Sequence, residues 1–183
     1  MKRIEEVYRE MLFQSMEKKN SIMSQSYLAG ALKVSLSIIN LALRPLRKMN
    51  AVKVNKRSLE IIDKRKIVYY WASIRNVEKD IIYKTRAEKP VRKIESEMPA
   101  DILYGAYSAY KFKFKDVPAD YSEVYIYSDD IKEIEKMFPK NNKPANIFIL
   151  KKDINMEKMT IANIFVDLWN LKEWYAKDFF KCF

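Results

Sequence analysis

The chain has 183 residues, among them 35 Lys or Arg, 24 Asp or Glu, no His, one Cys and two Gly. Without histidine it cannot build a Ser-His-Asp or Cys-His nucleophile, an imidazole general base or a His-containing zinc site. Two glycines, Gly30 and Gly105, are too few for a P-loop or a Gly-rich dinucleotide-binding turn. The single Cys182 allows neither an internal disulfide nor a CxxC metal or redox site, which suits a reducing cytosol.

The apolar content of the chain is high enough for a packed core. Hydrophobic residues make up 49% of the sequence and aromatic residues 13%, so the net charge of +11 does not imply disorder. No apolar run approaches the roughly 20 residues that span a bilayer, and the charged, amphipathic N-terminus has no signal-peptide apolar block. We therefore expect a globular, cytoplasmic protein that does not bind a membrane.

Positive charge is concentrated in the N-terminal third of the chain. Residues 18–59 contain nine Lys or Arg and no Asp or Glu. Residues 1–60 hold 12 basic and 5 acidic residues, a net charge of +7, whereas residues 61–183 hold 23 and 19, a net charge of +4. A long basic segment without acidic residues is typical of a surface that binds a polyanion, although a solvated basic face shows the same charges.

Three helices are predicted in the first 50 residues. The first is amphipathic and ends near Lys19. Ser24 is expected to cap a second helix over residues 25–33, and Ser35 a third, because serine hydroxyls accept hydrogen bonds from the free N–H groups of a first turn. Pro45 lies inside the third helix, where it either kinks the helix or makes Arg44 its last regular residue. The expected inward residues are Ile4, Val7, Tyr8, Met11 and Leu12 of the first helix and Leu36, Ile39, Leu43 and Leu46 of the third.

A β-hairpin with a basic tip is predicted directly after these helices. Residues 51–54 and 58–62 read as two strands around an Asn-Lys-Arg tip. Two short helices joined by a tight turn and followed by such a hairpin are typical of a winged helix-turn-helix domain. We therefore predict a winged helix-turn-helix DNA-binding domain over residues 1–62.

The third helix and the hairpin supply the expected contacts with double-stranded DNA. Small polar and Arg side chains near the start of a recognition helix can hydrogen-bond to base edges in the major groove, and the cations of a basic hairpin can bind phosphates. Because one such domain reads only a short half-site, we expect a homodimer. The predicted DNA-binding residues are Ser35, Ser37, Ile38, Asn40, Leu41, Arg44 and Arg47 on the helix and Lys53, Lys56 and Arg57 on the hairpin.

Beyond the hairpin, the pattern predicts a connecting helix within residues 63–79 and a small mixed-sheet α/β domain over residues 80–183. Asp63 is expected to cap the connecting helix, whose many aromatic residues suit a dimer contact. The fold class is thus α+β or α/β. The predicted strands are residues 80–84, 102–104, 123–127, 147–150 and 164–166, and the predicted helices are residues 90–98, 106–112, 129–138 with Asp129 as cap, and 171–183.

The acidic residues of this second domain do not form a recognisable catalytic pattern. A nucleotidyltransferase-like site needs a Gly-Ser turn and two carboxylates that alternate on one strand face and hold magnesium. Asp120 and Glu123 are three residues apart, which places them on opposite faces of a strand. We expect solvated carboxylates and helix caps here, including Asp129, Asp130 and Asp167, so that the chain has no catalytic residues, no metal site and no cofactor and is not an enzyme.

One aromatic cluster in the same domain could stack a ligand ring. A packed core between a helix and the sheet is its expected role, because large aromatic side chains usually bury their surface. The cluster consists of Tyr104, Tyr107, Tyr110, Phe112 and Phe114.

Five segments of the sequence carry a family resemblance: SQSYLAGALKVSLSIINLALRPLRKMNAV, KIVYYWASIRN, MPADILYGAYSAYKFKF, VPADYSEVYIY and IFVDLWNLKEWYAKDFF. They resemble the AbiE-type antitoxin family of winged-helix transcriptional regulators of type IV toxin–antitoxin systems, over nearly the whole chain. The resemblance implies a winged helix that binds operator DNA upstream of its own gene pair and a C-terminal repression or antitoxin module. The residues that it carries over are Ser35, Ser37, Asn40, Arg44, Lys56 and Arg57.

Three functions are therefore open at this point. The first is a DNA-binding transcriptional repressor, either a stand-alone regulator or an antitoxin that regulates its own operon. The second is a protein-interaction module whose C-terminal domain neutralises a toxin or another protein partner. The third is a nucleotide-handling enzyme built on the α/β domain.

Overall fold

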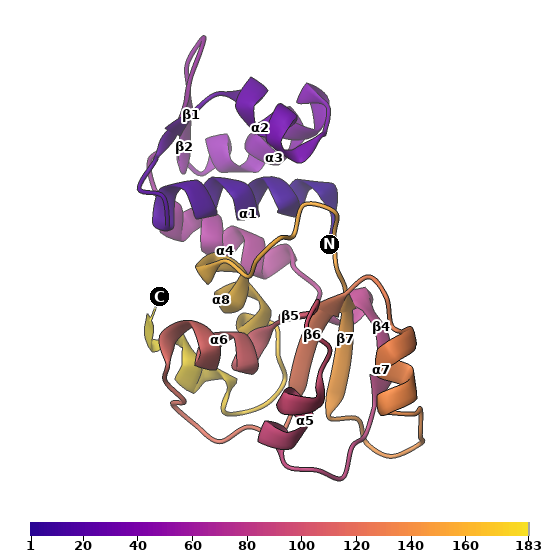
Figure 1. The fold of residues 1–183 in the computed structure, drawn as a ribbon. Helices are drawn as coiled ribbons and strands as arrows, with labels where there is room; N and C mark the ends of the chain where they lie inside the picture. Colours follow the sequence, from indigo (N-terminus) through magenta and orange to yellow (C-terminus); the bar gives the residue numbers. More distant parts are fainter. Residues whose placement is uncertain (183) are drawn as a thin grey trace. The chain divides into compact units, whose positions relative to one another are not determined.

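The computed structural model describes residues 1–182, and within them it shows a mixed α+β fold with eight α-helices and two small sheets (Figure 1). Phe183 lies outside the described residues, as do the side chains of Lys181 and Cys182. The chain divides into two compact units. Unit 1 comprises Met1–Arg75 and Thr160–Val166, and unit 2 comprises Asn76–Met159 and Asp167–Phe183.

Unit 1 is built mainly from helices, with a small sheet at one side. Its helices are α1 (Arg3–Met16), α2 (Gln25–Leu32), α3 (Leu36–Lys48) and α4 (Lys64–Ile74), together with the first part of α8 (Ile161–Trp169). Its strands β1 (Ile22–Met23), β2 (Val52–Val54) and β3 (Leu59–Ile61) form an antiparallel sheet in the order β1-β3-β2. In Figure 1, α1 lies between the α2–α3 pair and α4, and it packs against all three helices.

The predicted apolar stripes form the core of unit 1. Val7, Tyr8, Met11 and Leu12 of α1 are fully buried, as are Ile39, Leu43 and Leu46 of α3. Leu36 is an exception, because its side chain is 50% exposed and its predicted inward position is wrong. It is the first residue of α3 and lies beyond the packed part of the stripe.

The three predicted helix caps of unit 1 are confirmed. The hydroxyl of Ser24 accepts a hydrogen bond from the Tyr27 amide at 2.9 Å, and that of Ser35 accepts one from Ile38 at 3.4 Å. The carboxylate of Asp63 accepts the Lys66 amide at 3.1 Å. Each cap satisfies one of the amide groups that a helix start leaves without an internal partner.

Helix α3 continues through Pro45 to Lys48, so the proline does not end the helix. Proline has no N–H to offer to the carbonyl four residues earlier. That carbonyl belongs to Leu41, which is 58% exposed, so water can take the place of the missing donor. The first helix ends at Met16, earlier than predicted, and β1 was not predicted because two residues are too short to show a strand pattern.

Unit 2 is a four-stranded mixed sheet with helices on its faces. Its strands follow the order β4-β7-β6-β5, in which β6 and β7 are parallel and the other pairs antiparallel. The strands are β4 (Ile81–Thr85), β5 (Leu103–Tyr104), β6 (Val124–Ser128) and β7 (Ile147–Lys151). The helical elements are α5 (Val91–Glu97), α6 (Ala106–Phe114), α7 (Lys132–Met137), the end of α8, and the 3₁₀ helices η1 (Glu78–Asp80) and η2 (Ala176–Cys182).

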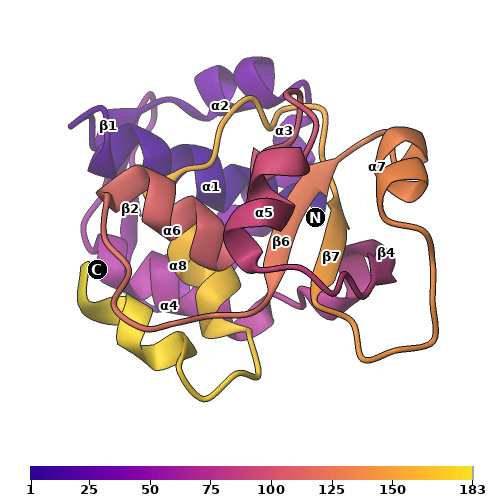
Figure 2. The ribbon, with the colours of Figure 1, turned by 60° about the horizontal axis from the view of Figure 1, so that its bottom comes forward.

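One face of this sheet packs under α5 and α7. Figure 2 shows α5 in front of β6 and α7 beside β7. The buried residues between these layers are Tyr83, Ile94, Ile102, Val124, Ile126, Ile134, Phe138, Ile147 and Ile149. Part of the other face is covered by α6 and η2, where Tyr107 and Tyr110 make ring contacts with Phe179 at centroid distances of 5.0 and 5.1 Å.

Several predictions for residues 80–183 are wrong in detail. Residues 164–166 lie in helix α8 and not in a strand, because a short buried apolar run fits either structure. The terminal helix predicted over residues 171–183 is limited to the 3₁₀ helix η2. All five residues of strand β6 are buried, because it is a central strand covered on both faces.

The start of α7 also differs from its prediction. Asp129 does not cap the helix, which begins at Lys132; the Lys132 amide donates instead to Asp130 Oδ1 at 2.9 Å. Near the end of the helix Met137 is 38% exposed, whereas Phe138 is buried in the core. Within residues 1–182 no helix combines the length and apolar character that crossing a membrane requires.

Candidate nucleic-acid interface

The turn between α2 and α3 fixes the start of the predicted reading helix. Lys33 closes α2 in the left-handed conformation, with a φ of 52°. The amide of Val34 then donates to the Ala29 carbonyl at 3.0 Å, which is the kind of bond that ends a helix tightly. Ser35 follows at once as the cap of α3. The two helices are therefore joined by only three residues.

Helix α3 has one buried and one exposed face. The buried face carries Ala42 as well as the predicted leucines, and the Tyr8 hydroxyl of α1 donates to the Ala42 carbonyl at 2.9 Å. This buried bond fixes the rotation of α3 relative to α1 within unit 1. The predicted site residues of α3 are exposed, except for Ile38, which is half-buried: Ser35, Ser37, Asn40, Leu41, Arg44 and Arg47.

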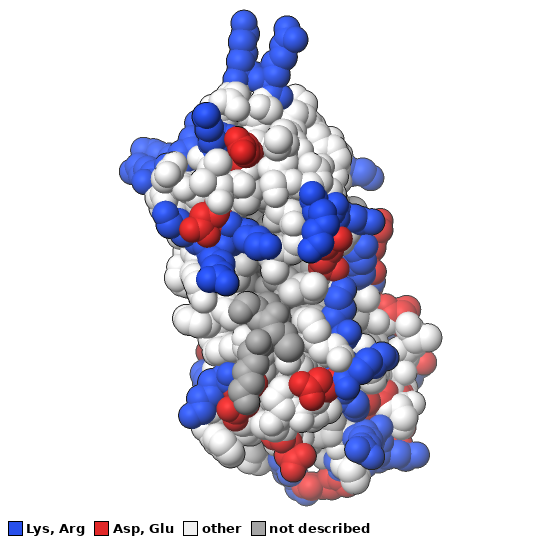
Figure 3. Space-filling view, turned by 90° about the vertical axis from the view of Figure 1, so that its left-hand side faces the viewer, with Lys and Arg blue, Asp and Glu red and all other residues white. Residues whose placement is uncertain are grey.

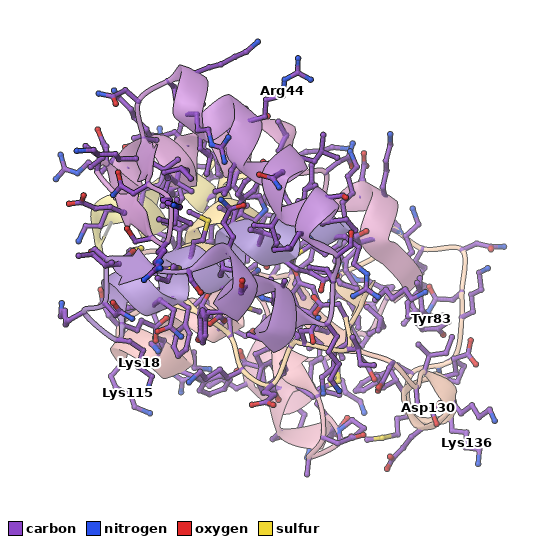
Figure 4. The ribbon with its side chains drawn as sticks, turned by 90° about the horizontal axis from the view of Figure 1, so that it is seen from above. Lys18, Arg44, Tyr83, Lys115, Asp130 and Lys136 are labelled. Atoms are coloured by element: carbon purple, nitrogen blue, oxygen red, sulfur yellow. The ribbon has the colours of Figure 1, made fainter. Side chains whose placement is uncertain are left out.

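Two of these exposed residues are joined by a hydrogen bond. Arg47 Nη2 donates to Asn40 Oδ1 at 3.3 Å, and Asn40 Nδ2 donates to the Leu36 carbonyl at 3.1 Å. The Asn40 amide is thus held along the helix, with its second N–H still available. Arg44 forms no hydrogen bond or ion pair among the described residues, and Figure 4 shows its side chain pointing away from the ribbon. This guanidinium is free to bind a base edge or a phosphate.

The hairpin tip is closed by its own hydrogen bonds. The Asn55 amide donates to the Ser58 carbonyl at 2.8 Å, and the Asn55 side chain donates to Ser58 Oγ at 3.2 Å. Lys56 and Arg57 occupy the two positions between them and are exposed. Figure 3 shows blue Lys and Arg side chains projecting from the end of unit 1 at which Figure 1 draws the turn between β2 and β3. The tip therefore presents two cations on a short, closed turn.

Lys53 differs from the two cations of the tip. It lies on β2 directly across from Glu60 of β3. Opposite charges at a cross-strand pair attract each other, so the Glu60 carboxylate lowers the positive potential around Lys53. Its contribution to a basic surface is smaller than that of Lys56 or Arg57.

The structure also places the start of α2 beside the hairpin tip, which the sequence did not indicate. A hollow of about 250 Å³ is lined by Ser24, Gln25 and Ser26 on one side and by residues 55–58 on the other. The pairing of Ile22 with Glu60 brings these segments together, because β1 leads directly into Ser24. No local sequence pattern could have joined two segments about 30 residues apart.

The acidic residues of unit 2 are scattered and do not form a metal site. Within residues 1–182 no group of three His, Cys, Asp or Glu side chains could hold a metal ion. Asp167 is fully buried in α8 and accepts the Tyr127 hydroxyl through both of its oxygens, at 2.9 and 2.8 Å. Glu123 accepts a hydrogen bond from the Tyr175 hydroxyl. Both carboxylates are thus bound by tyrosines in the structure.

The predicted aromatic cluster is largely part of the core. Tyr107 and Tyr110 are fully buried, and Tyr107 stacks on Tyr121 at a centroid distance of 5.3 Å. Burial and the nearby Glu173 carboxylate raise the pKa of the Tyr107 hydroxyl, which donates to Glu173 at 3.0 Å. Only Phe112 among the cluster is exposed, at 41%. These rings pack α6 against the sheet and are not arranged around an empty site.

Comparisons with known proteins gave no match: no family model matches the chain, and neither a curated protein nor a solved structure is significantly similar to it. The resemblance to the AbiE-type family therefore stays a prediction that depends on the segments quoted above.

Proposed function

We propose that the chain is a DNA-binding transcriptional regulator whose unit 1 is a winged helix-turn-helix domain. One observation carries the proposal. The exposed face of α3, with Ser37, Asn40 and Arg44, and the hairpin tip, with Lys56 and Arg57, belong to a segment of 42 residues, 18–59, without a single acidic side chain. This segment therefore contributes only positive charge to the surface that a phosphate backbone would approach.

The order of elements in unit 1 supports this role. The chain runs α1, β1, α2, α3, β2, β3, with β3 paired between β1 and β2. A helix-turn-helix pair followed directly by a hairpin is the arrangement that places a recognition helix and a wing on one DNA duplex. In this proposal α3 enters the major groove, and the wing contacts the backbone.

The two parts of the interface have different tasks. Asn40 and Arg44 carry the donors and acceptors that distinguish base pairs in the major groove. Lys56 and Arg57 neutralise phosphates, which contributes affinity without sequence information. The buried bond from Tyr8 to α3 holds the reading helix in a fixed orientation. The proposed role is binding without catalysis.

The sequence resemblance adds a target to this proposal. A regulator of the AbiE type would bind DNA upstream of its own gene, as a homodimer on two half-sites. Whether a toxin is its partner is a separate proposal, because nothing in the geometry of unit 1 depends on it.

The proposal is tested with the double variant Arg44→Ala/Lys56→Ala. Fluorescence anisotropy is measured on a duplex from the upstream region of the gene and on duplexes selected from a random pool. We expect at least a tenfold loss of affinity, because hydrogen bonds to charged groups each contribute about 1.5–3 kcal/mol.

The matched control is Lys132→Ala/Lys136→Ala, which removes the same charge from α7 of unit 2. Both lysines are exposed, and Figure 4 shows Lys136 pointing outward. The control should bind DNA like the wild type. Equal binding by both double variants, with unchanged circular dichroism, would overturn this placement of the interface.

A further inference from the structure

A second hollow lies on unit 2, on the sheet face opposite α7. Its volume is about 670 Å³, within the range of small-molecule sites. Strands β4, β6 and β7 form its floor, and η1 and the segment 170–173 border it. Helix α6 and η2 pack over the β5 side of this face, so the hollow occupies the part near β4.

The floor of the hollow is a row of three side chains across the sheet. Lys84 of β4 is the register partner of Phe148 on β7, and Phe148 is the partner of Tyr125 on β6. The rings of Tyr125 and Phe148 stack at a centroid distance of 4.7 Å with only 12° between their planes. Tyr125 is buried, whereas Phe148 is half-buried. Phe148 thus has an exposed apolar surface next to a lysine.

Four lysines surround this aromatic floor: Lys79, Lys84, Lys140 and Lys172. Lys172 is paired with Glu78, and its hydrogen bond and charge lower the pKa of that carboxyl, with a smaller contribution from Lys84. Lys79, Lys84 and Lys140 form no ion pair among the described residues, and all three are exposed.

The remaining acid at the hollow is already engaged. Glu173 accepts hydrogen bonds from the hydroxyls of Tyr107 at 3.0 Å and Tyr125 at 3.3 Å. Both of its oxygens are used in this way, so the carboxylate is turned toward the tyrosines. The net character of the hollow is therefore positive, with an aromatic floor.

We propose that this hollow binds a nucleotide, with its base against Phe148 and its phosphates between Lys79, Lys84 and Lys140. A planar, polarisable ring fits the exposed face of a stacked aromatic pair. Phosphate oxygens fit a group of ammonium donors. The site is in unit 2 and uses none of the residues of the DNA interface, so it is independent of the proposed function.

The same features favour a single nucleotide as the ligand over a strand of nucleic acid or a small anion. A strand of nucleic acid needs an open path along the sheet and several stacking platforms. Here Phe148 is the one half-exposed ring on the floor, and the segment 170–173 borders the hollow. A small anion without a ring would contact the lysines but would make no use of the apolar surface of Phe148.

The test is isothermal titration calorimetry of the full chain with ADP, GDP and inorganic phosphate. We expect binding of at least one nucleoside diphosphate, a loss of about tenfold or more in Lys84→Glu, and a several-fold loss in Phe148→Leu. Leucine keeps most of the buried apolar volume, so the second variant should fold. The control Lys136→Glu makes the same charge change on α7 and should bind like the wild type.

Three outcomes would overturn the proposal. The first is the absence of heat and of thermal stabilisation with millimolar ADP and GDP. The second is that inorganic phosphate binds as tightly as the nucleoside diphosphates, which would show that contact of the base with Phe148 contributes nothing to the affinity. The third is tighter binding of a single-stranded oligonucleotide through Lys84 and Phe148. DNA binding is also measured on the Lys84→Glu protein. This measurement tests the DNA-binding function proposed for unit 1 independently of the nucleotide site in unit 2.

Discussion

Trp71 Nε1 donates a hydrogen bond to Glu5 Oε2 at 3.2 Å and so joins α4 to α1 in the interior of unit 1. Arg75 Nη1 lies 3.5 Å from the same oxygen, and both charged side chains are almost fully buried, with exposures of 1% for Arg75 and 2% for Glu5. A buried charge is tolerated only where a partner of opposite sign and hydrogen bonds replace water. The Glu5 carboxylate therefore links α1 to α4 through two residues, Glu5 and Trp71, that lie 66 positions apart in the sequence.

We predict that Glu5→Gln destabilises the protein by about 3 kcal/mol, because the amide can still accept from Trp71 but removes the buried negative charge that lies 3.5 Å from the Arg75 guanidinium. Urea denaturation followed by circular dichroism measures the change. Glu10→Gln on the same helix is the control and should cost less than about 1 kcal/mol, since its bonds to Gln14 and Tyr27 are largely in contact with solvent. Equal effects of the two substitutions would show that burial of the pair is unimportant.

Replacement of Pro45 should stabilise the protein. Alanine restores an N–H donor for the Leu41 carbonyl and removes the ring from the helix interior, so Pro45→Ala is expected to raise the free energy of unfolding by about 1–3 kcal/mol. Pro90→Ala is the control. Pro90 precedes α5 with a φ of −58°, where proline fits, so its loss should cost about 0.4–1 kcal/mol. A destabilised Pro45→Ala would mean that the proline ring makes packing contacts worth more than the hydrogen bond.

The two glycines should respond in opposite ways to alanine. A Cβ on Gly30 meets nothing within 4 Å, so Gly30→Ala inside α2 should stabilise by about 0.5–1 kcal/mol. A Cβ on Gly105 would lie 3.1 Å from Cε2 of Tyr127, a fully buried ring tethered to Asp167. The ring cannot move aside freely, so Gly105→Ala should cost about 1–3 kcal/mol. Melting temperatures of the two variants on opposite sides of the wild type would bear this out, and a shift in the same direction would contradict it.

Stability should fall in alkaline solution because of the buried tyrosines of unit 2. Burial, followed by nearby carboxylates, raises the pKa of Tyr107 and Tyr125, and burial and Glu123 raise the pKa of Tyr175 to about 12. The unfolded chain ionises these hydroxyls near pH 10. Unfolding then releases protons, so the stabilisation is complete below pH 10 and for Tyr175 is lost between about pH 10 and 12.

The slope of this loss measures the number of tyrosines involved. Each one contributes about 1.4 kcal/mol per pH unit above pH 10. Denaturation of the wild type and of Tyr107→Phe between pH 9 and 11.5 should show a shallower slope for the variant. Parallel curves for the two proteins would exclude Tyr107 as a contributor.

Salt dependence should separate the two parts of the DNA interface. If Lys56 binds a phosphate, Lys56→Ala should reduce the slope of log affinity against log salt by about 1, equally for all duplex sequences. Asn40→Ala should leave that slope unchanged and reduce the discrimination between duplexes, because an amide reads bases and releases no counterion. An unchanged slope in Lys56→Ala would remove the wing from the interface.

Much of unit 1 could be predicted from local sequence. Its helix starts follow from single side chains, such as Ser24, Ser35 and Asp63, whose caps depend on residues only three positions away. The stripes of α1 and α3 follow from spacing along one helix. The basic tip also depends on adjacent residues, so the exposure of Lys56 and Arg57 was predictable.

Several of the less accurate predictions concern features that depend on distant segments. Residues 164–166 are a buried apolar run, and only their surroundings make them helical rather than extended. Lys53 looked equivalent to Lys56 until the strand register placed Glu60 beside it. The start of α2 reaches the hairpin tip only because β1 pairs with β3.

The sequence by itself thus determined the charge distribution, the capped helix starts of unit 1 and the absence of histidine and Gly-rich chemistry, since each depends on composition or on neighbours a few residues apart. Only the tertiary structure decided which side chains meet across the chain. It placed Arg75 and Trp71 on Glu5, and it aligned Lys84, Phe148 and Tyr125 in one row. Strand order and register set these neighbours, and both result from packing of the whole unit rather than from any local pattern.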